Sequence, residues 1–329
     1  MVELIYENPK IYRIFVPLPE NPLKLLNSYV IITENRNLII DTGFKREECL
    51  KALLGGLKEL KLELEKTDIF LTHLHSDHCG LINKLTTDNN KVYMSEIDYD
   101  YLIGNLIGDN WKKIEERFKE EGFPNDIAFR LKESNHAKRF APDKIFEVIK
   151  LKNEDKIQIG DTELIGIHTP GHTPGHMCLY IPKEKILFSG DHVLFDITPN
   201  ITSWLEKKDS LGDYIESLKK IKKLDIKTTF PGHREIGISI YDRIDSILNH
   251  HKERLEELLE VLSKKDSQTA YEIASQMTWN TRGKGWNEFP DNQKWFATGE
   301  TMSHLDYLYC RNKIEKILDK DNFYKYSIK

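Results

Sequence analysis

Four short apolar runs in this sequence each end in a turn of small residues that carries a histidine or an aspartate. The first run, 68–71, leads into THLHSDH at 72–78, and the others contain TPGHTPGH at 169–176, FSGDH at 188–192 and FPGH at 230–233. Apolar runs of this length, bounded by glycine and proline, are typical of strands that end in tight turns. We therefore expect four strand ends that converge on one rim of a β-rich fold.

The segment at 72–78 places four side chains that can bind metal ions within six residues. His73 and His75 lie two residues apart on one extended segment and can face one ion, while Asp77 and His78 turn toward a second. The alternative is a polar turn that is rich in histidine by chance. The three further segments make this alternative less favoured, because each also places a histidine or an aspartate at the end of an apolar run. Imidazole and carboxylate ligands without thiolates suit zinc, and also iron or manganese. We predict two divalent metal ions, with zinc favoured.

Strands with helices between them are expected up to about residue 240. The predicted strands are 29–33, 38–41, 68–71, 91–94, 156–159, 163–168, 177–181 and 185–188. Apolar residues at three- and four-residue steps predict helices at 46–60 and 212–224. This pattern favours two sheets, or one mixed sheet, with helices packed outside.

Residues 95–140 differ from their surroundings because they are helical in pattern and carry many aromatic side chains among charges. We interpret them as a helical insertion between two strands. One interpretation is extra packing, and the other is a cap over the active site, since binding groups are often carried by segments added to a scaffold. In the second case Trp111 and Phe118 are the candidate substrate contacts.

The strand pattern almost disappears from residue 241 onward. A long amphipathic helix is predicted at 244–262, and Asp266–Ser267 is expected to cap a short helix at 268–277. A further helix to about Leu318 and a terminal strand at 323–328 complete what resembles a small winged-helix unit. We therefore expect two domains, 1–240 and 241–329.

Charge and composition limit where the chain works and what it binds. The net charge is −5, and the segment 241–329 holds 14 Lys/Arg against 15 Asp/Glu, so no basic surface for nucleic acid is evident. No apolar stretch approaches the roughly 20 residues that span a membrane, and no signal peptide is visible at the start. The four scattered cysteines suit free thiols in a reducing compartment. We expect a cytoplasmic protein that does not bind membranes.

The order and spacing of HxHxDH, TPGHTPGH, SGD and PGH resemble the metallo-β-lactamase superfamily over about residues 10–235. The resemblance implies an α/β fold, an αββα sandwich with the metal ions at one edge. It assigns the ligands in two sets joined by one bridging carboxylate: His73, His75 and His172 for the first ion, Asp77, His78 and His233 for the second, and Asp191 between them. The implied reaction is hydrolysis by a metal-bridging hydroxide, with Asp77 and Asp191 as catalytic residues of the site.

The other histidines have weaker contexts. His176 lies four residues after His172, and we predict that it orients a ligand from behind. His192 follows Asp191, and its two interpretations are a proton donor to the leaving group and a packed neighbour. The remaining histidines are interpreted as structural or surface residues: His136, His168, His250, His251 and His304.

Several branches of the superfamily remain open as expectations. The TPGHTPGH stretch resembles glyoxalase II-type thioesterases, although the chain beyond residue 240 lacks their glutathione-binding ending. The C-terminal unit resembles the extension of lactamase-like endoribonucleases, which keeps RNA processing as the alternative. A lactamase is disfavoured because Asp191 is present, and the complete ligand set disfavours a non-catalytic binding protein. A redox role as in flavodiiron proteins is disfavoured by His75 and by the lack of a flavodoxin domain. We predict a hydrolase of an ester, thioester or phosphodiester-like small molecule, with a homodimer as its assembly.

Overall fold

The structure, a computed structural model, describes residues 1–237, 239–280, 283 and 285–329. The chain forms two compact units, each built from three segments. The first contains 1–108, 136–199 and 220–243, and the second contains 109–135, 200–219 and 244–329. This division differs from the predicted domains 1–240 and 241–329, because helices of the insertion share an apolar core with the C-terminal helices. Among the described residues, no helix is both long and apolar enough to span a membrane.

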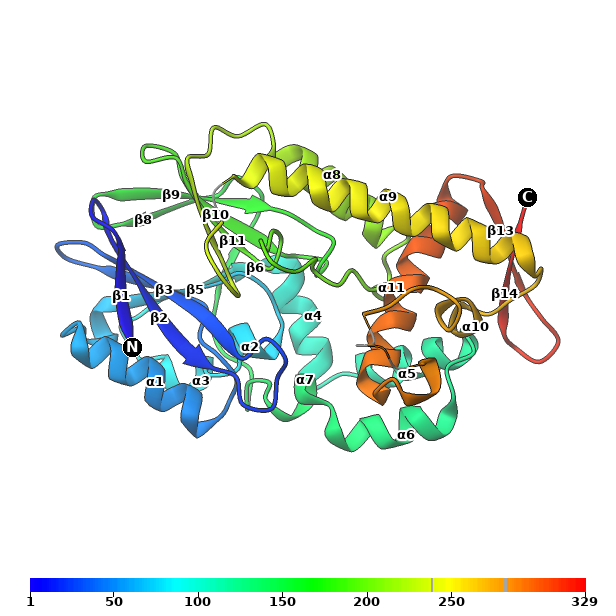
Figure 1. Cartoon of the computed structure of the whole chain (residues 1–329). Helices are drawn as coiled ribbons and strands as arrows, with labels where there is room; N and C mark the ends of the chain where they lie inside the picture. Colours follow the sequence, from blue (N-terminus) through cyan, green and yellow to red (C-terminus); the bar gives the residue numbers. More distant parts are fainter. Residues whose placement is uncertain (238, 281–282, 284) are drawn as a thin grey trace. The chain divides into compact units, whose positions relative to one another are not determined.

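The first unit is built on two β-sheets, seen as blue-to-cyan and green strands in Figure 1. In spatial order the seven-stranded sheet contains β1 (Val2–Tyr6), β2 (Lys10–Pro17), β3 (Leu25–Ile32), β4 (Asn37–Ile40), β5 (Thr67–Leu71), β6 (Val92–Ser95) and β7 (Ile149–Leu151). The five-stranded sheet contains β12 (Thr228–Pro231), β11 (Ile186–Gly190), β10 (Met177–Ile181), β9 (Thr162–His168) and β8 (Lys156–Ile159). The predicted strands are all present, whereas β1, β2 and β7 were not anticipated.

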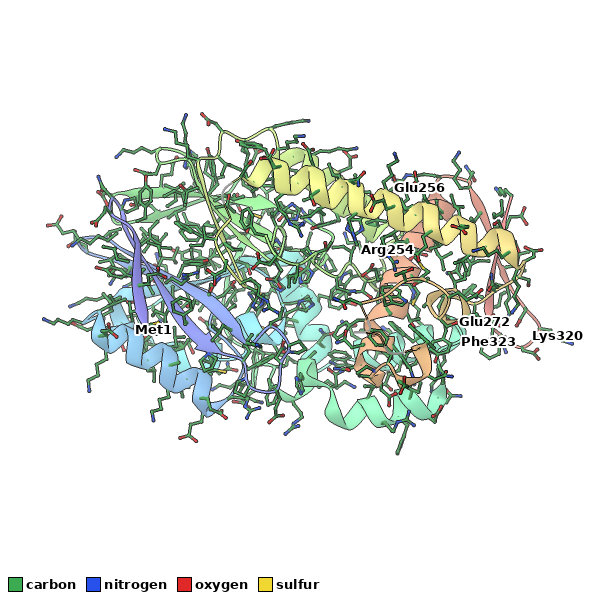
Figure 2. The ribbon with its side chains drawn as sticks, in the orientation of Figure 1. Met1, Arg254, Glu256, Glu272, Lys320 and Phe323 are labelled. Atoms are coloured by element: carbon green, nitrogen blue, oxygen red, sulfur yellow. The ribbon has the colours of Figure 1, made fainter. Side chains whose placement is uncertain are left out.

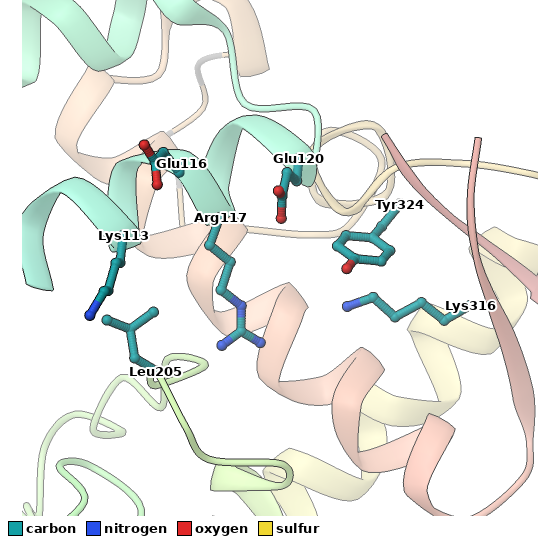
Figure 3. Close-up of a pocket in the computed structure, with 7 residues that line it drawn as sticks. All are labelled: Lys113, Glu116, Arg117, Glu120, Leu205, Lys316 and Tyr324. Carbon is teal, nitrogen blue, oxygen red and sulfur yellow. The ribbon is translucent and has the colours of Figure 1, made fainter. Parts of the chain in front are cut away.

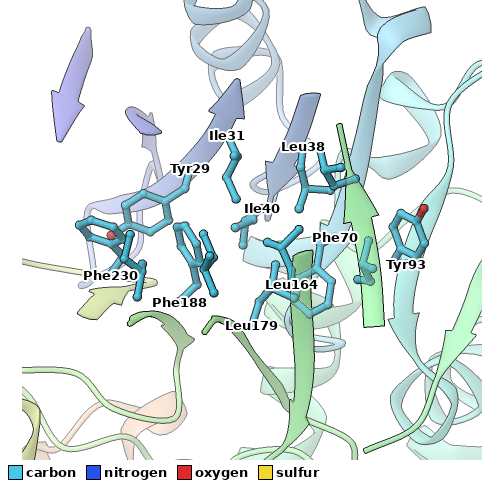
Figure 4. Packing of buried hydrophobic residues seen from close by; sticks show 14 of the residues in the cluster. Tyr29, Ile31, Leu38, Ile40, Phe70, Tyr93, Leu164, Leu179, Phe188 and Phe230 are labelled. Carbon is cyan, nitrogen blue, oxygen red and sulfur yellow. The ribbon is translucent and has the colours of Figure 1, made fainter. Parts of the chain in front are cut away.

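Apolar side chains from both sheets form one shared core. Alternate residues of β3, Tyr29 and Ile31, point into it, and Phe188 and Phe230 meet Tyr29 from the other sheet with ring centroids 5.4 Å apart. Figure 4 shows the rings of Tyr29, Phe188 and Phe230 packed together. Because side chains alternate across a strand, each sheet presents one face to this core and the other to helices or solvent. The predicted sandwich is confirmed.

Strand direction brings three of the four predicted turns to one edge of the second sheet. In the first sheet β4, β5, β6 and β7 run parallel to one another. In the second, β9 and β11 are both antiparallel to β10, and β12 is parallel to β11. The carboxyl ends of β9, β11 and β12 therefore share one edge, and the turns at 169–176, 190–192 and 231–233 follow those ends directly.

Helices accompany the sheets of the first unit. They are α1 (Glu47–Glu59), the 3-10 helix η1 (Leu64–Lys66), α2 (Ser76–Cys79), α3 (Ile82–Leu85), α4 (Glu96–Leu106) and α7 (His136–Arg139). Helix α1 packs on β2 so closely that a Cβ at Gly56 would lie 2.7 Å from the Ile14 side chain. Two of the unit boundaries fall within helices, namely α8 (Ser210–Ile221) and α9 (Ile240–Lys264).

The second unit combines helices with one β-hairpin. Its further elements are α5 (Asn110–Glu120), α6 (Asn125–Ser134), α10 (Ala270–Ala274), the 3-10 helix η2 (Trp286–Glu288), α11 (Asp291–Cys310), β13 (Ile314–Leu318) and β14 (Tyr324–Ile328). The helix predicted to reach Leu318 is wrong at its end: it stops at Cys310, Asn312 adopts a φ of 56°, and β13 begins. The short helix is capped by Thr269 in a capping box with Glu272 rather than by Asp266–Ser267.

Candidate metal centre

The first cluster of histidines lies in the first unit, on the turns after β5 and β9. His73 Nε2 lies 3.0 Å from His75 Nδ1, and His172 Nε2 lies 3.0 Å from the same His75 atom. Their ligand-capable nitrogens all fall within 4.8 Å of one another. Three imidazoles that converge in this way can hold one metal ion.

A second cluster adjoins the first. His78 Nε2 lies 3.2 Å from His233 Nε2, and His233 Nε2 lies 3.4 Å from Asp77 Oδ2. These three side chains also have ligand atoms within 4.8 Å of one another. The structure thus brings together the residues predicted for the second ion.

Asp191 faces both clusters with different oxygens. Its Oδ2 lies 3.6 Å from His172 Nε2, whereas its Oδ1 lies 3.6 Å from His78 Nε2 and 3.5 Å from His233 Nε2. Oδ1 is buried and accepts no hydrogen bond from any residue that the structure describes. A buried carboxylate oxygen without a hydrogen-bond donor is unfavourable unless a cation satisfies it, so the geometry fits a metal ion at this place.

The protonation states of two of the first-cluster histidines and of both carboxylates also suit metal binding. Burial lowers the pKa of His75 to about 3 and lowers that of His73, so both imidazoles are neutral. Burial alone would raise the pKa of Asp77, but the nearby His78 and His233 outweigh it and bring the pKa to about 2. The pKa of Asp191 is lowered well below its usual range by the same two histidines. Neutral imidazoles and ionised carboxylates are the forms that bind divalent metals.

The histidines of the second cluster are oriented by hydrogen bonds at their far nitrogens. His78 Nδ1 lies 2.8 Å from Asp41 Oδ2, and His233 Nδ1 lies 2.8 Å from the Leu25 carbonyl oxygen. Each Nε2 therefore points toward the shared centre. Burial would lower the pKa of His78, but Asp41 and Asp191 outweigh it and raise the pKa.

Asp41 was not among the predicted site residues, although the strand predicted at 38–41 ended on it. Its Oδ1 accepts a hydrogen bond from Thr72 N–H, and its Oδ2 accepts one from the Thr72 hydroxyl, both at 2.8 Å. Asp41 adopts a φ of 60°, a conformation that non-glycine residues rarely occupy. One sequence signal could have identified Asp41: like Asp191, it is an aspartate at the end of an apolar run that was predicted to be a strand.

His176 lies behind the centre and contacts the backbone of Asp191. The Asp191 N–H donates to His176 Nε2 at 3.2 Å, so the proton of this ring is on Nδ1, which faces the Thr169 hydroxyl at 2.9 Å. The predicted orienting role of His176 agrees with this contact and stays a prediction. His192 is buried, with its ring 5.9 Å from that of His176, and its role as proton donor also stays a prediction.

Glycines directly precede two of the candidate ligands, Asp191 and His233, and the space around these glycines explains why small residues stand there. A Cβ at Gly190 would lie 2.8 Å from His176 Nε2, and a Cβ at Gly232 would lie 2.7 Å from Asp191 Oδ1. Gly190 also adopts a φ of 48°. Side chains at these positions would displace the groups that face the centre.

Trp111 and Phe118 lie in the second unit. Phe118 is 2% exposed and stacks on Trp295 with ring centroids 3.6 Å apart. The structure therefore shows Phe118 as a core side chain of that unit, and its role as a substrate contact stays a prediction. His251 and His304, interpreted as structural or surface residues, are both buried in this unit.

A separate cleft of about 420 Å³ lies within the second unit (Figure 3). Its lining residues are Lys113, Glu116, Arg117, Glu120, Leu205, Lys316 and Tyr324. All three of its cations are already paired. Arg117 contacts Asp306 at 3.1 Å, and Lys316 contacts Glu121 at 2.9 Å. Lys113 contacts Asp109 at 2.8 Å. The cleft contains none of the seven predicted metal ligands.

Known families and proteins match this chain over most of its length. The family described as metallo-beta-lactamase superfamily matches residues 24–233, and the one described as metallo-beta-lactamase-like, C-terminal domain matches residues 255–329. The chain is similar to a probable metallo-hydrolase, YqjP, of Bacillus subtilis (strain 168), 25% identical over 87% of this chain and 88% of that protein. It is also similar to an atrochrysone carboxyl ACP thioesterase of Emericella nidulans, 25% identical over 78% of this chain and 66% of that protein.

A solved structure with a similar fold is that of a metallo-beta-lactamase family protein from Thermus thermophilus. It has a TM-score of 0.81 and 25% sequence identity, and the match covers 97% of this chain and 98% of the other. The likeness therefore extends over both units, including the segments beyond the sandwich.

Proposed function

The chain belongs to the metallo-β-lactamase superfamily and is a hydrolase of that superfamily. We propose that it works with two divalent metal ions, of which zinc is favoured. We propose a small ester, thioester or phosphodiester-like molecule as its substrate. The observation that carries this proposal is the position of Asp191, whose two oxygens face two separate sets of three ligands. The thioesterase name of one relative supports a thioester as the first substrate class to test.

The distances support the proposed ligand sets. The first ion would be held by His73, His75 and His172, the second by Asp77, His78 and His233, and Asp191 would reach both. When bound, such ions polarise the scissile carbonyl or phosphoryl group and lower the pKa of water toward neutrality.

The chain itself supplies proton acceptors rather than a covalent nucleophile. Asp77 is ionised at neutral pH, and its Oδ2 lies at the centre, where it can take a proton from an attacking water. Cys79 is the nearest thiol in sequence, but burial raises its pKa well above the usual value, and its Sγ–H donates to the Leu74 carbonyl oxygen at 3.2 Å. Because a protonated buried thiol is a poor nucleophile, direct hydrolysis is the expected course.

A metal analysis combined with a substrate panel tests the proposal. Protein purified without chelator should contain close to two metal ions per chain. It should hydrolyse an acyl-thioester faster than bis-p-nitrophenyl phosphate or single-stranded RNA, and the Asp191→Ala variant should lose this activity. Full activity in protein that contains no metal would overturn the proposal.

The second candidate is a ribonuclease guided by the helices and hairpin of the second unit, which we propose as a winged-helix-like module. Charge argues against it, since 241–329 has no basic excess and the cations Arg117 and Lys316 are engaged by Asp306 and Glu121. RNA cleavage that disappears in Asp191→Ala would favour this candidate over the small-molecule hydrolase.

A further inference from the structure

A buried carboxylate on α4 connects two of the turns that carry metal-ligand candidates. Asp98 is 0% exposed. Its Oδ2 accepts hydrogen bonds from the Leu74 N–H at 3.0 Å and from the Thr173 hydroxyl at 2.6 Å. Its Oδ1 accepts one from the Gly175 N–H at 2.6 Å. Leu74 belongs to the turn after β5 and the other two partners belong to the turn after β9, so one side chain joins both turns.

These partners are neighbours of the first ligand set in the chain. Leu74 lies between His73 and His75, and Thr173 directly follows His172. The carboxylate of Asp98 therefore controls how far the His73–His75 segment stands from the His172 segment. A shift of either turn would change the spacing of the three imidazoles that would hold the first ion.

Packing around Asp98 leaves little room for adjustment. A Cβ at Gly175 would lie 2.4 Å from the Asp98 backbone nitrogen and 2.7 Å from Ser95 Oγ. Gly175 is thus seated directly against the first turn of α4. The helix holds the carboxylate in place, and the carboxylate holds the two turns.

The second ligand set is oriented by different groups. His78 is held through Asp41, and His233 is held through the Leu25 carbonyl oxygen. The Asn27 amide also donates to the carbonyl oxygens of Pro231 and Arg234, on either side of His233, at 3.1 and 2.9 Å.

We propose that Asp98 is a positioning residue that sets the affinity of the first ion site, formed by His73, His75 and His172, much more strongly than that of the second site. This inference rests on the two-ion function proposed above. Groups that orient ligands from behind typically change metal affinity about 10- to 100-fold when they are removed.

Asparagine at position 98 tests the carboxylate with almost no change of shape. The amide has one acceptor oxygen and one NH₂ group, whereas Asp98 accepts from backbone N–H groups with both oxygens. Either amide orientation therefore points NH₂ hydrogens at a backbone N–H, of Gly175 or of Leu74. At least one hydrogen bond between α4 and a ligand turn is lost.

Single-site backgrounds separate the two ions. In His233→Ala, which removes a ligand of the second site, Asp98→Asn should weaken Zn²⁺ binding about 10- to 100-fold in a titration against a chromophoric chelator. In His172→Ala, which removes a ligand of the first site, the same change should alter binding by less than about threefold. These ratios measure metal affinity and do not depend on catalytic turnover.

Asp68 offers a matched control. It is a buried carboxylate, 3% exposed, at the other end of β5, where its Oδ1 accepts from the Lys91 N–H at 2.8 Å. Asp68→Asn should lower the melting temperature and leave Zn²⁺ affinity unchanged in both backgrounds. If Asp98→Asn behaves in the same way, or weakens both sites equally, the inference is wrong.

A second variant covers the case in which Asp98→Asn does not fold. Thr173→Val removes only the hydrogen bond from the Thr173 hydroxyl to Asp98. It should weaken Zn²⁺ binding at the first site by a smaller factor than Asp98→Asn does. An unchanged affinity would overturn the inference.

The Zn²⁺ titration of the wild-type protein distinguishes this inference from the proposed function. Fewer than two Zn²⁺ per wild-type chain would contradict the proposed function, whereas two Zn²⁺ with no effect of Asp98→Asn would contradict only the role of Asp98.

Discussion

Each unit contains a pair of histidines whose ring nitrogens lie about 3 Å apart, but the surroundings of the two pairs differ. In the first unit His73 Nε2 lies 3.0 Å from His75 Nδ1, and in the second His251 Nδ1 lies 3.1 Å from His304 Nε2. Among the residues that the structure describes, the sets of three ligand atoms close enough to share an ion all lie in the first unit. Proximity of two imidazoles is therefore not sufficient for a metal site.

Carboxylates account for the difference. In the second unit His304 Nδ1 lies 2.7 Å from the Glu300 carbonyl oxygen and donates to it, so its Nε2 accepts from His251. The Glu300 carboxylate is engaged by the Asn200 amide at 3.1 Å and by Arg254 at 3.6 Å. Figure 2 labels Arg254 and the exposed Glu256 on opposite sides of α9. This cluster is a polar contact between helices, whereas Asp191 in the first unit keeps an oxygen directed at the centre.

The largest effect is expected from removing that oxygen. Asp191→Ala should lower kcat/KM for the best substrate about 10⁴-fold, equivalent to about 5.5 kcal/mol, because both ions lose a ligand. Elemental analysis should show fewer than two metal ions per chain. Glu300→Gln, a change to the acid beside the His251–His304 pair, serves as the control and should retain both ions. Equal metal loss in the two variants would remove the distinction between the clusters.

Phe118→Ala should destabilise the second unit by about 3–5 kcal/mol, because a buried ring stacked on Trp295 is replaced by a cavity. Urea unfolding measures this change. The control is Phe129→Ala, since Phe129 is 73% exposed and its removal should stay within about 0.5 kcal/mol. A raised KM in fully folded Phe118→Ala would instead support the predicted substrate contact.

His304→Leu should destabilise the protein by about 1–3 kcal/mol, because His251 Nδ1–H would be left buried without its acceptor. The variant should still contain two metal ions per chain, in contrast to His172→Ala. Loss of metal from His304→Leu would show that the His251–His304 pair supports the metal centre.

The last expected effect is a pH dependence of stability. Burial lowers the pKa of His304 to about 3, below the ordinary value near 6.5 of an unfolded chain. Below pH 6.5 the unfolded state binds a proton that the folded state does not, so stability falls as the pH drops from about 6.5 toward 3, by up to about 1.4 kcal/mol per unit. In the presence of a metal chelator, the free energy of unfolding of His304→Asn should fall less steeply between pH 6.5 and 5 than that of the wild type. Identical slopes would contradict this account.

Local patterns predicted most of the first unit. The strands at 156–159 and 177–181 match β8 and β10 at both ends, because short apolar runs between turn residues are set by local sequence. The hairpin strand β13 was missed, because Ile314–Leu318 continues the apolar spacing of α11 after only three residues, Arg311–Lys313. Asn312, which adopts a positive φ, was the signal for a turn there.

The sequence by itself determined the family, the sandwich and the candidate ligands, because histidines and aspartates gather on turns that directly follow apolar strands. Only the tertiary structure showed which acids lie behind those ligands. Asp98 lies in the segment SEIDYDY, where nothing marks it as part of a site, and its partners are as far away as Thr173 and Gly175. The physical reason is that a buried carboxylate is defined by the donors around it, and folding brings those donors from distant parts of the chain.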